Sequence, residues 1–517
     1  MPIKLAPPTL LDRVVGYLNP RAGLERARDR TMLASLQGGY KGGKHDRRET
    51  KNWKPGGNSA NADLLPELDT LRARGRDLAR NMPIATGAIA TKKTHVVGDG
   101  LTLSAQCDRR TLGISEAQAT EFNRFAEREF ALAASTADFT RVQHFAELQA
   151  MVFGAELESG DVFVIRRWRL DPGDVYGTKL QVIEGDRICN PNRIADTDTL
   201  VAGIEHSEQG VPLAVHVANR HPGDLIRKAL TWRRVPLRYN DGRPIVLHLF
   251  DRQRPDQSRG IPYLAPVIEA MKSLGDYSDA EVRAAVVSAM FTVFVKNSPD
   301  QDSSPLPTTA GTGTGGKDEI ELAPGAVVDL AEGESIEVAN PGRPNPQFDA
   351  FVTAFLRQIG VALEMPFELL IKHFTSSYSA SRAALEMAWH TFRRDRTGLA
   401  RKLCQPFYEW IIEEAVILGR LNAPGFFDDP LIRAAWLRAK WTGPVRITLD
   451  QKKDAEADAI DIETGVKTRQ QVMTERTGGD FEQKTEELAR EETARKSAGL
   501  PTSVAAQPTA PEPPTED

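Results

Sequence analysis

The residue pattern that comes nearest to a catalytic motif is the glycine-rich run at residues 311–318, GTGTGGKD. It fits the spacing G-x-x-x-x-G-K, in which backbone N–H groups and a lysine surround phosphate oxygens. Such a loop needs an apolar strand before it, a helix after it and a Ser or Thr that ligates Mg²⁺. Here SSPLPTTA precedes the run and Asp318 occupies the hydroxyl position, where its carboxylate would repel phosphate. We interpret the run as a linker and keep nucleotide hydrolysis as an alternative.

Two pairs of carboxylates have a spacing that could suit metal-dependent chemistry. Glu184 and Asp186 in VIEGDRI resemble the pair of a nuclease, but a strand that ends in a turn explains them as well. Asp196 and Asp198 form D-x-D within PNRIADTDT, where Asp side chains commonly accept hydrogen bonds from turn backbone. Neither pair belongs to a recognisable catalytic arrangement.

The histidines and cysteines also lack the spacing of a metal site. His206, His216 and His248 stand in strand-like runs and are interpreted as structural residues. C-x-x-C, H-E-x-x-H and G-x-S-x-G do not occur. The sequence therefore predicts no catalytic residue, cofactor or metal ligand.

Composition limits the class of protein. The 517 residues are 40% hydrophobic, enough for a core and for more than one domain. A formal net charge of -5 argues against a protein that holds nucleic acid by bulk attraction. Three widely spaced cysteines fit a reducing compartment. The sequence start lacks signal-peptide features, and the longest apolar run is shorter than a membrane span, so we expect a soluble, cytoplasmic product.

Two long helical segments are the most informative part of the chain. They are predicted at about residues 266–296 and 345–363, and at ~1.5 Å per residue the first would be roughly 45 Å long. Its end, AAVVSAMFTVFV at residues 284–295, is apolar on every face and must be shielded from water. That requirement indicates an assembly of several chains.

The insert between these helices is acidic and rich in Gly and Pro. Its runs IEL, AVVDL and SIEV can pair as short strands. Two interpretations of the insert remain open. It could be a docking surface on a strand-bearing tip, or merely a soluble excursion of the chain. Within residues 317–337 a single basic residue accompanies seven acidic ones: Asp318, Glu319, Glu321, Asp329, Glu332, Glu334 and Glu337.

After the second helix, residues 373–382 (HFTSSYSASR) concentrate small hydroxyl side chains. Ser379 or Ser381 could cap the next helix, which would explain the composition. The functional alternative is a mobile, weakly polar loop that touches something sliding past. The next helix is predicted from about Ser381 to Gly419, with a kink at Pro406.

The remaining patterns indicate an α+β fold. Residues 1–60 are basic and irregular, either a solvated arm or an arm that grips a neighbour or nucleic acid. Helical patterns follow from residue 62, including a capping box at Ser115 and Gln118 and an inward face containing Val142. Strands are predicted at 161–170, 179–184, 201–206, 213–219, 244–250 and 445–450. A charged helical stretch is predicted at 451–497, followed by a Pro-rich tail.

Several segments, in order and over nearly the full length, resemble the lambda-type portal proteins of tailed bacteriophages. Arg259, Gly260 and Pro262 lie where the first long helix begins. The order and spacing of the segments carry the resemblance. They are ADLLPELDTLRARGRDLARNMPIATGAI, HVVGDGL, IEGDRICNPN, IVLHLFDRQRPDQSRGIPYLAPVIEAMKSL and FLRQIGVALEMPFELLIKHFTSSYSASRAALEMAWHTFRRDR.

This resemblance implies a mainly helical α+β portal-type fold, assembled as a ring, usually of twelve subunits, at one vertex of the phage head. Double-stranded DNA would enter and leave through its channel. The implied ranges are a basic arm at 1–60, a wing at 60–260, a first stem helix at 261–296, a clip at 297–344, a second stem helix at 345–371, a tunnel loop at 372–381, long wing helices at 382–444, a crown at 445–497 and a disordered tail at 498–517.

The resemblance also implies partners and a place in the virion after assembly in the host cytoplasm. The clip would dock the large terminase subunit and later head-completion or tail adaptor proteins, and the ring would meet the major capsid protein and scaffold. Residues expected at these surfaces are Lys372, His373, Thr375, Ser376, Ser377, Ser379 and Arg382 towards DNA; Asp318, Glu319, Glu321, Asp329, Glu332 and Glu334 in the clip; and Val286, Met290, Phe291, Phe351, Phe355 and Ile359 between subunits.

The charge of the chain agrees with a conduit. DNA carries about one negative charge per ~1.7 Å of axis, so a strongly cationic tunnel would trap it, whereas a net charge of -5 would let it slide. Packaging energy would come from the terminase and not from this chain. The remaining alternative is a phage adaptor or baseplate protein that binds other proteins but no DNA.

Overall fold

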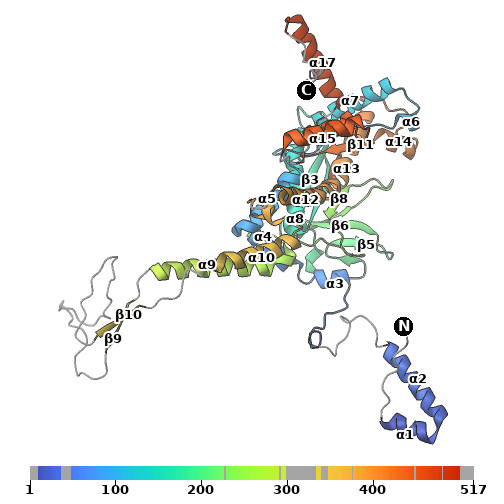
Figure 1. The fold of residues 1–517 in the computed structure, drawn as a ribbon. Helices are drawn as coiled ribbons and strands as arrows, with labels where there is room; N and C mark the ends of the chain where they lie inside the picture. The colour runs from blue at the N-terminus through green and yellow to red at the C-terminus, as the bar shows by residue number, and fades with distance from the viewer. Residues whose placement is uncertain are drawn as a thin grey trace, which may run out of the picture. The chain divides into compact units, whose positions relative to one another are not determined.

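The computed structural model describes residues 10–36, 48–225, 229–289, 293–297, 334–338, 347–374, 377–446, 450–479 and 481–500. The chain divides into two units, residues 1–62 and residues 63–517, and each is described by itself (Figure 1). Within the described ranges, no helix has the length and hydrophobicity needed to cross a membrane.

The first unit contains two helices, α1 (Leu10–Leu18) and α2 (Pro20–Leu36). The side chain of Asn19 accepts a hydrogen bond from the Ala22 N–H at 3.3 Å, and Pro20 starts α2, so the two residues separate the helices. The predicted irregular arm is therefore wrong for residues 10–36. The turn-rich composition that suggested it belongs to residues 38–57.

Helices open the second unit, and most follow the predicted periodicity. Ser115 and Gln118 form the predicted capping box. Pro83 separates two helices because the residue before a proline, Met82, is held extended. Val142 is 79% exposed, contrary to prediction, because the helix of that region starts later and is capped by His144. The helices are α3 (Ala60–Leu64), α4 (Leu68–Asn81), α5 (Pro83–Val96), α6 (Arg109–Leu112), α7 (Glu116–Ala134) and α8 (Phe145–Ser159).

Two antiparallel sheets form the strand region. The first has the order β3-β2-β8 and contains the predicted hairpin, and the second has the order β4-β5-β6-β7. The prediction missed the last strand of the second sheet, WRRVP. Its two adjacent arginines interrupt the alternation of apolar and polar residues that marks a strand. The strands are β2 (Asp161–Trp168), β3 (Thr178–Glu184), β4 (Leu200–Val201), β5 (Ile204–His206), β6 (Pro212–Ala218), β7 (Trp232–Pro236) and β8 (Val246–Phe250).

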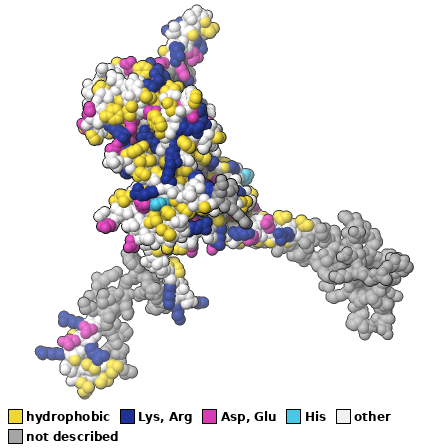
Figure 2. Space-filling model, turned by 180° about the vertical axis from the view of Figure 1, so that it is seen from behind, with side chains coloured by type: hydrophobic (Ala, Val, Ile, Leu, Met, Phe, Trp, Pro, Cys, Tyr) yellow, Lys and Arg dark blue, Asp and Glu magenta, His cyan; other side chains and the backbone are white. Residues whose placement is uncertain are grey.

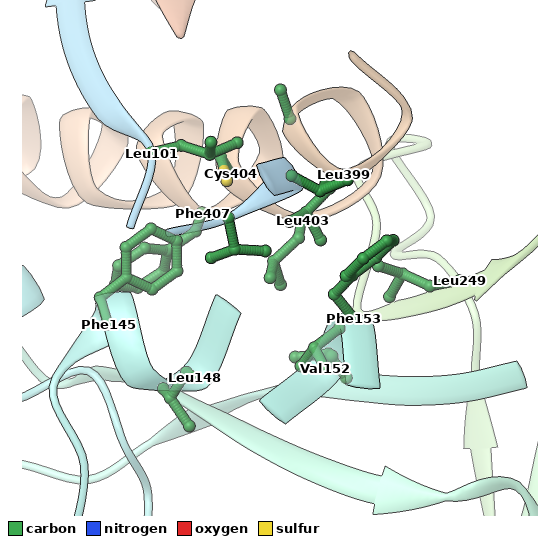
Figure 3. Close-up of a cluster of buried hydrophobic side chains, with 14 of the residues drawn as sticks. Leu101, Phe145, Leu148, Val152, Phe153, Leu249, Leu399, Leu403, Cys404 and Phe407 are labelled. Atoms are coloured by element: carbon green, nitrogen blue, oxygen red, sulfur yellow. The ribbon is translucent and has the colours of Figure 1, made fainter. Parts of the chain in front are cut away.

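Each face of the first sheet is buried against a different layer. One face packs on helices and belongs to the main core, in which Leu148, Val152 and Phe153 of α8 lie near Leu403 and Phe407 (Figure 3). The other face packs on the second sheet. This second core consists of Phe163, Ile165, Ile183, Ile188, Ile204, Val215, Val217, Val235 and Val246.

A buried ion cluster joins α4, the first sheet and the segment before α9 (Ile268–Ala289). Asp161 is fully buried and accepts hydrogen bonds from Arg72 at 2.5 Å and from Arg259 at 2.6 Å. His248 lies 3.3 Å from the same carboxylate. Burial would raise the pKa of Asp161, but the charges of Arg259 and Arg72 hold that pKa well below its usual range. Asp161 therefore stays charged and fixes all three elements.

Two glycines permit the close approach around this cluster. The backbone carbonyl of Gly160 would lie 1.8 Å from a Cβ placed on Gly260, so the two segments touch backbone to backbone. Gly160 also has φ +86°, a conformation that favours glycine. The remaining donors of Arg259 reach the carbonyls of Gly185 at 2.6 Å and Ile188 at 2.8 Å.

The two long helices are α9 (Ile268–Ala289) and α10 (Phe348–Ala362), and they lie side by side (Figure 1). Tyr277 of α9 stacks on Phe348 at 5.5 Å and meets Phe351 at 4.9 Å between ring centroids. The predicted first helix is too long, since residues 293–297 form β9 (Val293–Asn297). β9 pairs with β10 (Glu334–Val338). Val, Phe and Val at 293–295 suit a strand at least as well as a helix.

A long helical run follows the short helix α11 (Phe367–Leu370). α12 (Tyr378–Leu399) continues through a π-helical segment at Ala400–Cys404 into α13 (Gln405–Ile417). The π-helical segment ends two residues before Pro406, where the sequence predicts a kink. Proline has no N–H to donate, and the preceding residue, Gln405, donates instead five residues back to the carbonyl of Ala400.

The C-terminal part of the second unit is mostly helical, with α14 (Pro430–Trp436) followed by β11 (Ala439–Thr442), which pairs with β1 (Thr102–Ala105). The strand predicted at 445–450 is wrong for the described residues there, and the strand lies earlier, at β11. The predicted charged helical stretch is present as α15 (Gln451–Glu463), α16 (Arg469–Thr477) and α17 (Phe481–Ser497).

The buried ion cluster makes a direct prediction. Asp161→Asn should lower the free energy of unfolding by about 3–5 kcal/mol, because two buried guanidinium groups lose their counterion. Asp63→Asn is the matched control: it removes an exposed ion pair with Arg254 and should cost less than about 1 kcal/mol. Urea unfolding of the full chain measures both, and equal losses would contradict the role of Asp161.

Candidate functional site

The loop between α11 and α12 is positioned by a helix end on one side and a helix cap on the other. The N–H of His373 donates to the carbonyl of Glu368 at 3.0 Å, and Lys372 adopts φ +55°, which together terminate α11. On the far side Ser377 caps α12 by accepting from the Ala380 N–H at 3.4 Å. Lys372 and His373 are exposed, so their side chains are available to a ligand.

The structure changes part of the predicted loop. The cap is Ser377, and Ser379 and Ser381 lie inside α12, so the predicted cap at Ser379 or Ser381 is wrong. Ser381 is buried and Ser379 is exposed. Thr375 and Ser376 lie outside the described residues.

Arg382, which the resemblance places towards DNA, has a partner within its own chain. Its guanidinium lies 3.3 Å from the carboxylate of Asp454 in α15. Lys453 stands over the ring of Tyr378 at 5.5 Å. An ion pair between Arg446 and Glu386 joins the same two regions. The first turns of α12 are thus attached to the start of the C-terminal helices.

A histidine of α5, His95, packs on α12 and carries no positive charge at neutral pH. His95 of α5 stacks on Phe392 of α12 with ring centroids 5.1 Å apart. Burial lowers the pKa of His95, and the positive charges of Arg396 and Lys372 lower it further. His95 is therefore neutral at neutral pH.

The end of α10 is fixed to α12 and to the segment before α9. The Tyr263 hydroxyl donates to the carbonyl of Leu363 at 2.5 Å, and Arg394 of α12 binds Glu364 at 2.6 Å. Lys92 and Asp395 form a further ion pair at 2.7 Å. These groups line a cavity of about 690 Å³ between α12 and the segment before α9. The contacts hold the second long helix at a defined position against α12.

The helix faces predicted to pack between subunits divide into two classes. Val286 is 51% exposed and Phe351 is 43% exposed, as a face that needs a neighbour would be. Phe355 is partly buried, whereas Ile359 is 1% exposed and belongs to the main core of its own chain. The prediction for Ile359 is therefore wrong, because α10 turns this position towards its own chain. Met290 and Phe291 lie outside the described residues.

Most residues of the predicted clip lie outside the described ranges. Glu334 is the first residue of β10 and pairs with Asn297 of β9. The SIEV run thus forms a strand, but its partner precedes the insert. The runs IEL and AVVDL, the glycine-rich run at 311–318 and the other clip residues, Asp318, Glu319, Glu321, Asp329 and Glu332, lie outside the described residues.

Of the carboxylates considered for metal chemistry, Glu184, Asp186 and Asp196 have partners within the chain. Asp186 forms an ion pair with Arg76, and Asp196 accepts from the Ala202 N–H at 2.8 Å within its turn. His216 lies 2.6 Å from Glu205. In the described part of the chain, no three His, Cys, Asp or Glu side chains are grouped as a metal site.

Sequence reasoning found Arg259 but not its partners Arg72 and Asp161. A signal was available for Asp161, which is a charged residue at the head of the apolar run VFVI.

Figure 2 shows basic, acidic and apolar side chains interspersed on the visible face of the second unit. The helix pair α9 and α10 carries exposed apolar side chains that another chain could cover.

Comparison with known proteins gives the family. Residues 46–396 match the family described as phage portal protein, lambda family, and the chain belongs to that family. It is 27% identical over 501 residues to the portal protein of Escherichia phage N15, covering 91% of this chain and 93% of that protein. It is 27% identical over 496 residues to portal protein B of Escherichia phage lambda, covering 91% and 92%.

A more distant relative and a solved structure are also similar. The probable portal protein of Halomonas phage phiHAP-1 is 23% identical over 475 residues, covering 88% of this chain and 86% of that protein. A chain in the neck of an empty gene transfer agent particle is 13% identical, with a TM-score of 0.42, covering 84% of this chain and 94% of that chain.

The two classes of residue on α10 should respond differently to truncation. Ile359→Ala should lower the free energy of unfolding by about 2–5 kcal/mol, because it leaves a cavity in the main core. Val361→Ala, two residues away and 81% exposed, should change it by less than about 0.5 kcal/mol. Urea unfolding distinguishes them, and a large loss for Val361→Ala would show that the chain covers this face itself.

The contact between α12 and α15 should be measurable as a pairwise coupling. In a double-mutant cycle with Arg382→Gln and Asp454→Asn, we expect a coupling of about 0.2–1 kcal/mol, since the pair is partly exposed. The cycle with Arg382→Gln and Asp461→Asn provides the control, because Asp461 pairs with Lys467 and not with Arg382. No coupling between Arg382 and Asp454 would mean that α15 does not restrain the loop.

Proposed function

We propose that copies of this chain form a ring at one vertex of a phage head and that double-stranded DNA passes through the channel of the ring. Membership of the lambda portal family is the observation that carries the proposal. A dodecamer is the assembly expected from the family resemblance. The chain would act as a structural conduit without catalysis, and the terminase would supply the packaging energy.

The proposed regions keep the ranges expected from the resemblance, except for the stem and the start of the clip. The wing comprises residues 60–260 and the helices of 382–444, and the crown comprises 445–497. α9 and α10 form the stem, and residues 372–381 form the tunnel loop. Because β9 begins at Val293, the clip is proposed to begin there and to extend to residue 344.

Exposed apolar side chains on the stem helices support the ring. Val282, Val286 and Phe351 are between 43% and 64% exposed. Apolar side chains at this density along a helix pair are typical of a surface that is covered by another chain. Neighbouring copies related by rotation would cover it with the same surfaces around the whole ring.

The tunnel loop suits weak contact with a moving duplex. Lys372 and His373 are exposed, while Arg382 is partly neutralised by Asp454 and His95 is neutral. A few phosphate contacts bind the backbone without reading sequence. The acidic clip is proposed to dock the large terminase subunit during packaging and head-completion or tail adaptor proteins afterwards, and the wing to contact the major capsid protein and scaffold.

Native mass measurement and electron microscopy of the purified full chain test this function. We expect a closed oligomer of about twelve copies with a central opening wide enough for duplex DNA. Lys372→Gln should leave the ring intact and weaken its binding to a labelled duplex, because it removes a phosphate contact. A stable monomer at high concentration, or a solid disc, would favour an adaptor protein that binds no DNA.

A further inference from the structure

A surface groove of about 750 Å³ is lined by α6, the helical run from α12 to α13, α14 and β11. Its apolar lining includes Ala400, Leu431, Leu437 and Trp441. Leu431 is 65% exposed, so part of this apolar surface is open to solvent. Grooves that combine aliphatic and aromatic side chains in this way can hold an extended peptide segment.

Four arginines also line the groove: Arg396, Arg401, Arg433 and Arg438. Two of them have carboxylate partners. Arg433 lies 3.1 Å from Glu413, and Arg438 lies 3.8 Å from Asp108. Glu409 is a further carboxylate of the lining. Burial raises the pKa of Glu409, and the charge of Arg433 opposes this shift, so Glu409 acts on an arginine that is already paired.

Arg396 and Arg401 have no carboxylate within ion-pair distance among the described residues. Arg396 donates from Nε to the carbonyl of Val96 at 3.2 Å and from Nη2 to the carbonyl of His95 at 2.8 Å. These neutral acceptors leave its positive charge uncompensated. Arg401 is exposed. The groove therefore carries an excess of positive charge beside its apolar surface, which favours an acidic occupant.

Residues 501–517, PTSVAAQPTAPEPPTED, have a composition that matches the groove. Glu512, Glu516 and Asp517 are acidic, and the segment contains no Lys or Arg. Five of its residues are proline. Proline-rich segments favour an extended conformation without internal hydrogen bonds, so they lose little conformational entropy when they dock against apolar and aromatic side chains. These residues lie outside the described ranges.

Contacts of α7 connect α17, which precedes this segment, with the groove. Arg124 of α7 forms an ion pair with Glu486 of α17. Phe122 of α7 packs on Trp436 of α14 with ring centroids 4.4 Å apart, and the next residue, Leu437, lines the groove. Beyond Glu486, α17 continues for roughly 16 Å. Residues 501–517 span roughly 55 Å when extended, which is enough to return to the groove.

We propose that the groove binds residues 501–517 of its own chain, with the carboxylates of this segment near Arg396 and Arg401 and its prolines against the apolar lining. Guanidinium and carboxylate groups form strong charge-assisted hydrogen bonds. The acidic insert is a less suitable occupant, because β9 and β10 flank it at the far end of α9, a helix of 22 residues. The proposal does not depend on the proposed conduit function.

Zero-length carbodiimide cross-linking of the full chain tests this contact, because the reagent joins an amine to a carboxylate only where the two meet. Arg401→Lys supplies the amine and keeps the charge. Peptide mapping should show a cross-link from position 401 to Glu512, Glu516 or Asp517. Arg393→Lys is the matched control: Arg393 is exposed on the same helical run but does not line the groove, and its cross-link to the segment should be several-fold weaker.

Two further measurements separate a docked segment from chance encounters. Lys496 of α17 is closer to residues 501–517 along the chain, so its cross-links to the segment report random collisions. Adding Leu431→Glu to Arg401→Lys should weaken the cross-link from position 401 several-fold, because it places a negative charge in the apolar lining. Leu431 is 65% exposed, so this change should leave the fold intact.

Three results would overturn the proposal. Equal cross-link yields at positions 401 and 393 and at Lys496 would mean that the segment has no fixed place. A cross-link from position 401 to the acidic insert, or to another copy in a mixture of isotope-labelled and unlabelled chains, would give the groove a different occupant. A folded Arg401→Lys chain without any cross-link from position 401 to residues 501–517 would likewise show that the groove does not bind them.

Discussion

The second unit depends on the buried carboxylate of Asp161 and the two guanidinium groups that bind it. Arg72 comes from α4, Asp161 from the start of β2, and Arg259 from the segment that leads into α9. Burying any one of these charges without the others would be prohibitive, so the three elements must come together in one arrangement. The direction in which the first long helix leaves the body is therefore set by an ion cluster inside the body. The glycines at 160 and 260 make that approach sterically possible.

The sequence predicted the elements whose signals are local. The capping box at Ser115 and the disturbance at Pro406 depend on residues within one or two helical turns, and the hairpin of β2 and β3 on alternation and a turn. The extent of α9 was not predictable in this way, since Val293 and its neighbours satisfy helix and strand patterns alike. Residues 293–297 form a strand because they pair with β10, which lies far along the chain.

The same reasoning explains what could be predicted of the site. Lys372 and His373 were correctly placed in a loop, since the hydroxyl-rich composition marks a break between helices. The partner of Arg382 is a residue 72 positions away, and the burial of Ile359 depends on which side of α10 meets the body. Neither the ion pair of Arg382 nor the burial of Ile359 can be predicted from the spacing of nearby residues. Charged residues inside apolar runs, such as Asp161, are the exception, because their burial already requires a partner.

Neighbouring arginines on one strand differ in their electrostatic surroundings, because side chains alternate between the two faces of a sheet. Arg166 of β2 lies near Glu413, and Arg234 of β7 binds Glu205. Arg167 shares its face with Ile165 of the second core and donates to the side-chain carbonyl of Gln181 instead. The net charge of -5 does not record such differences, so it describes only the bulk attraction that the proposed conduit would exert on DNA and not the contacts of single residues.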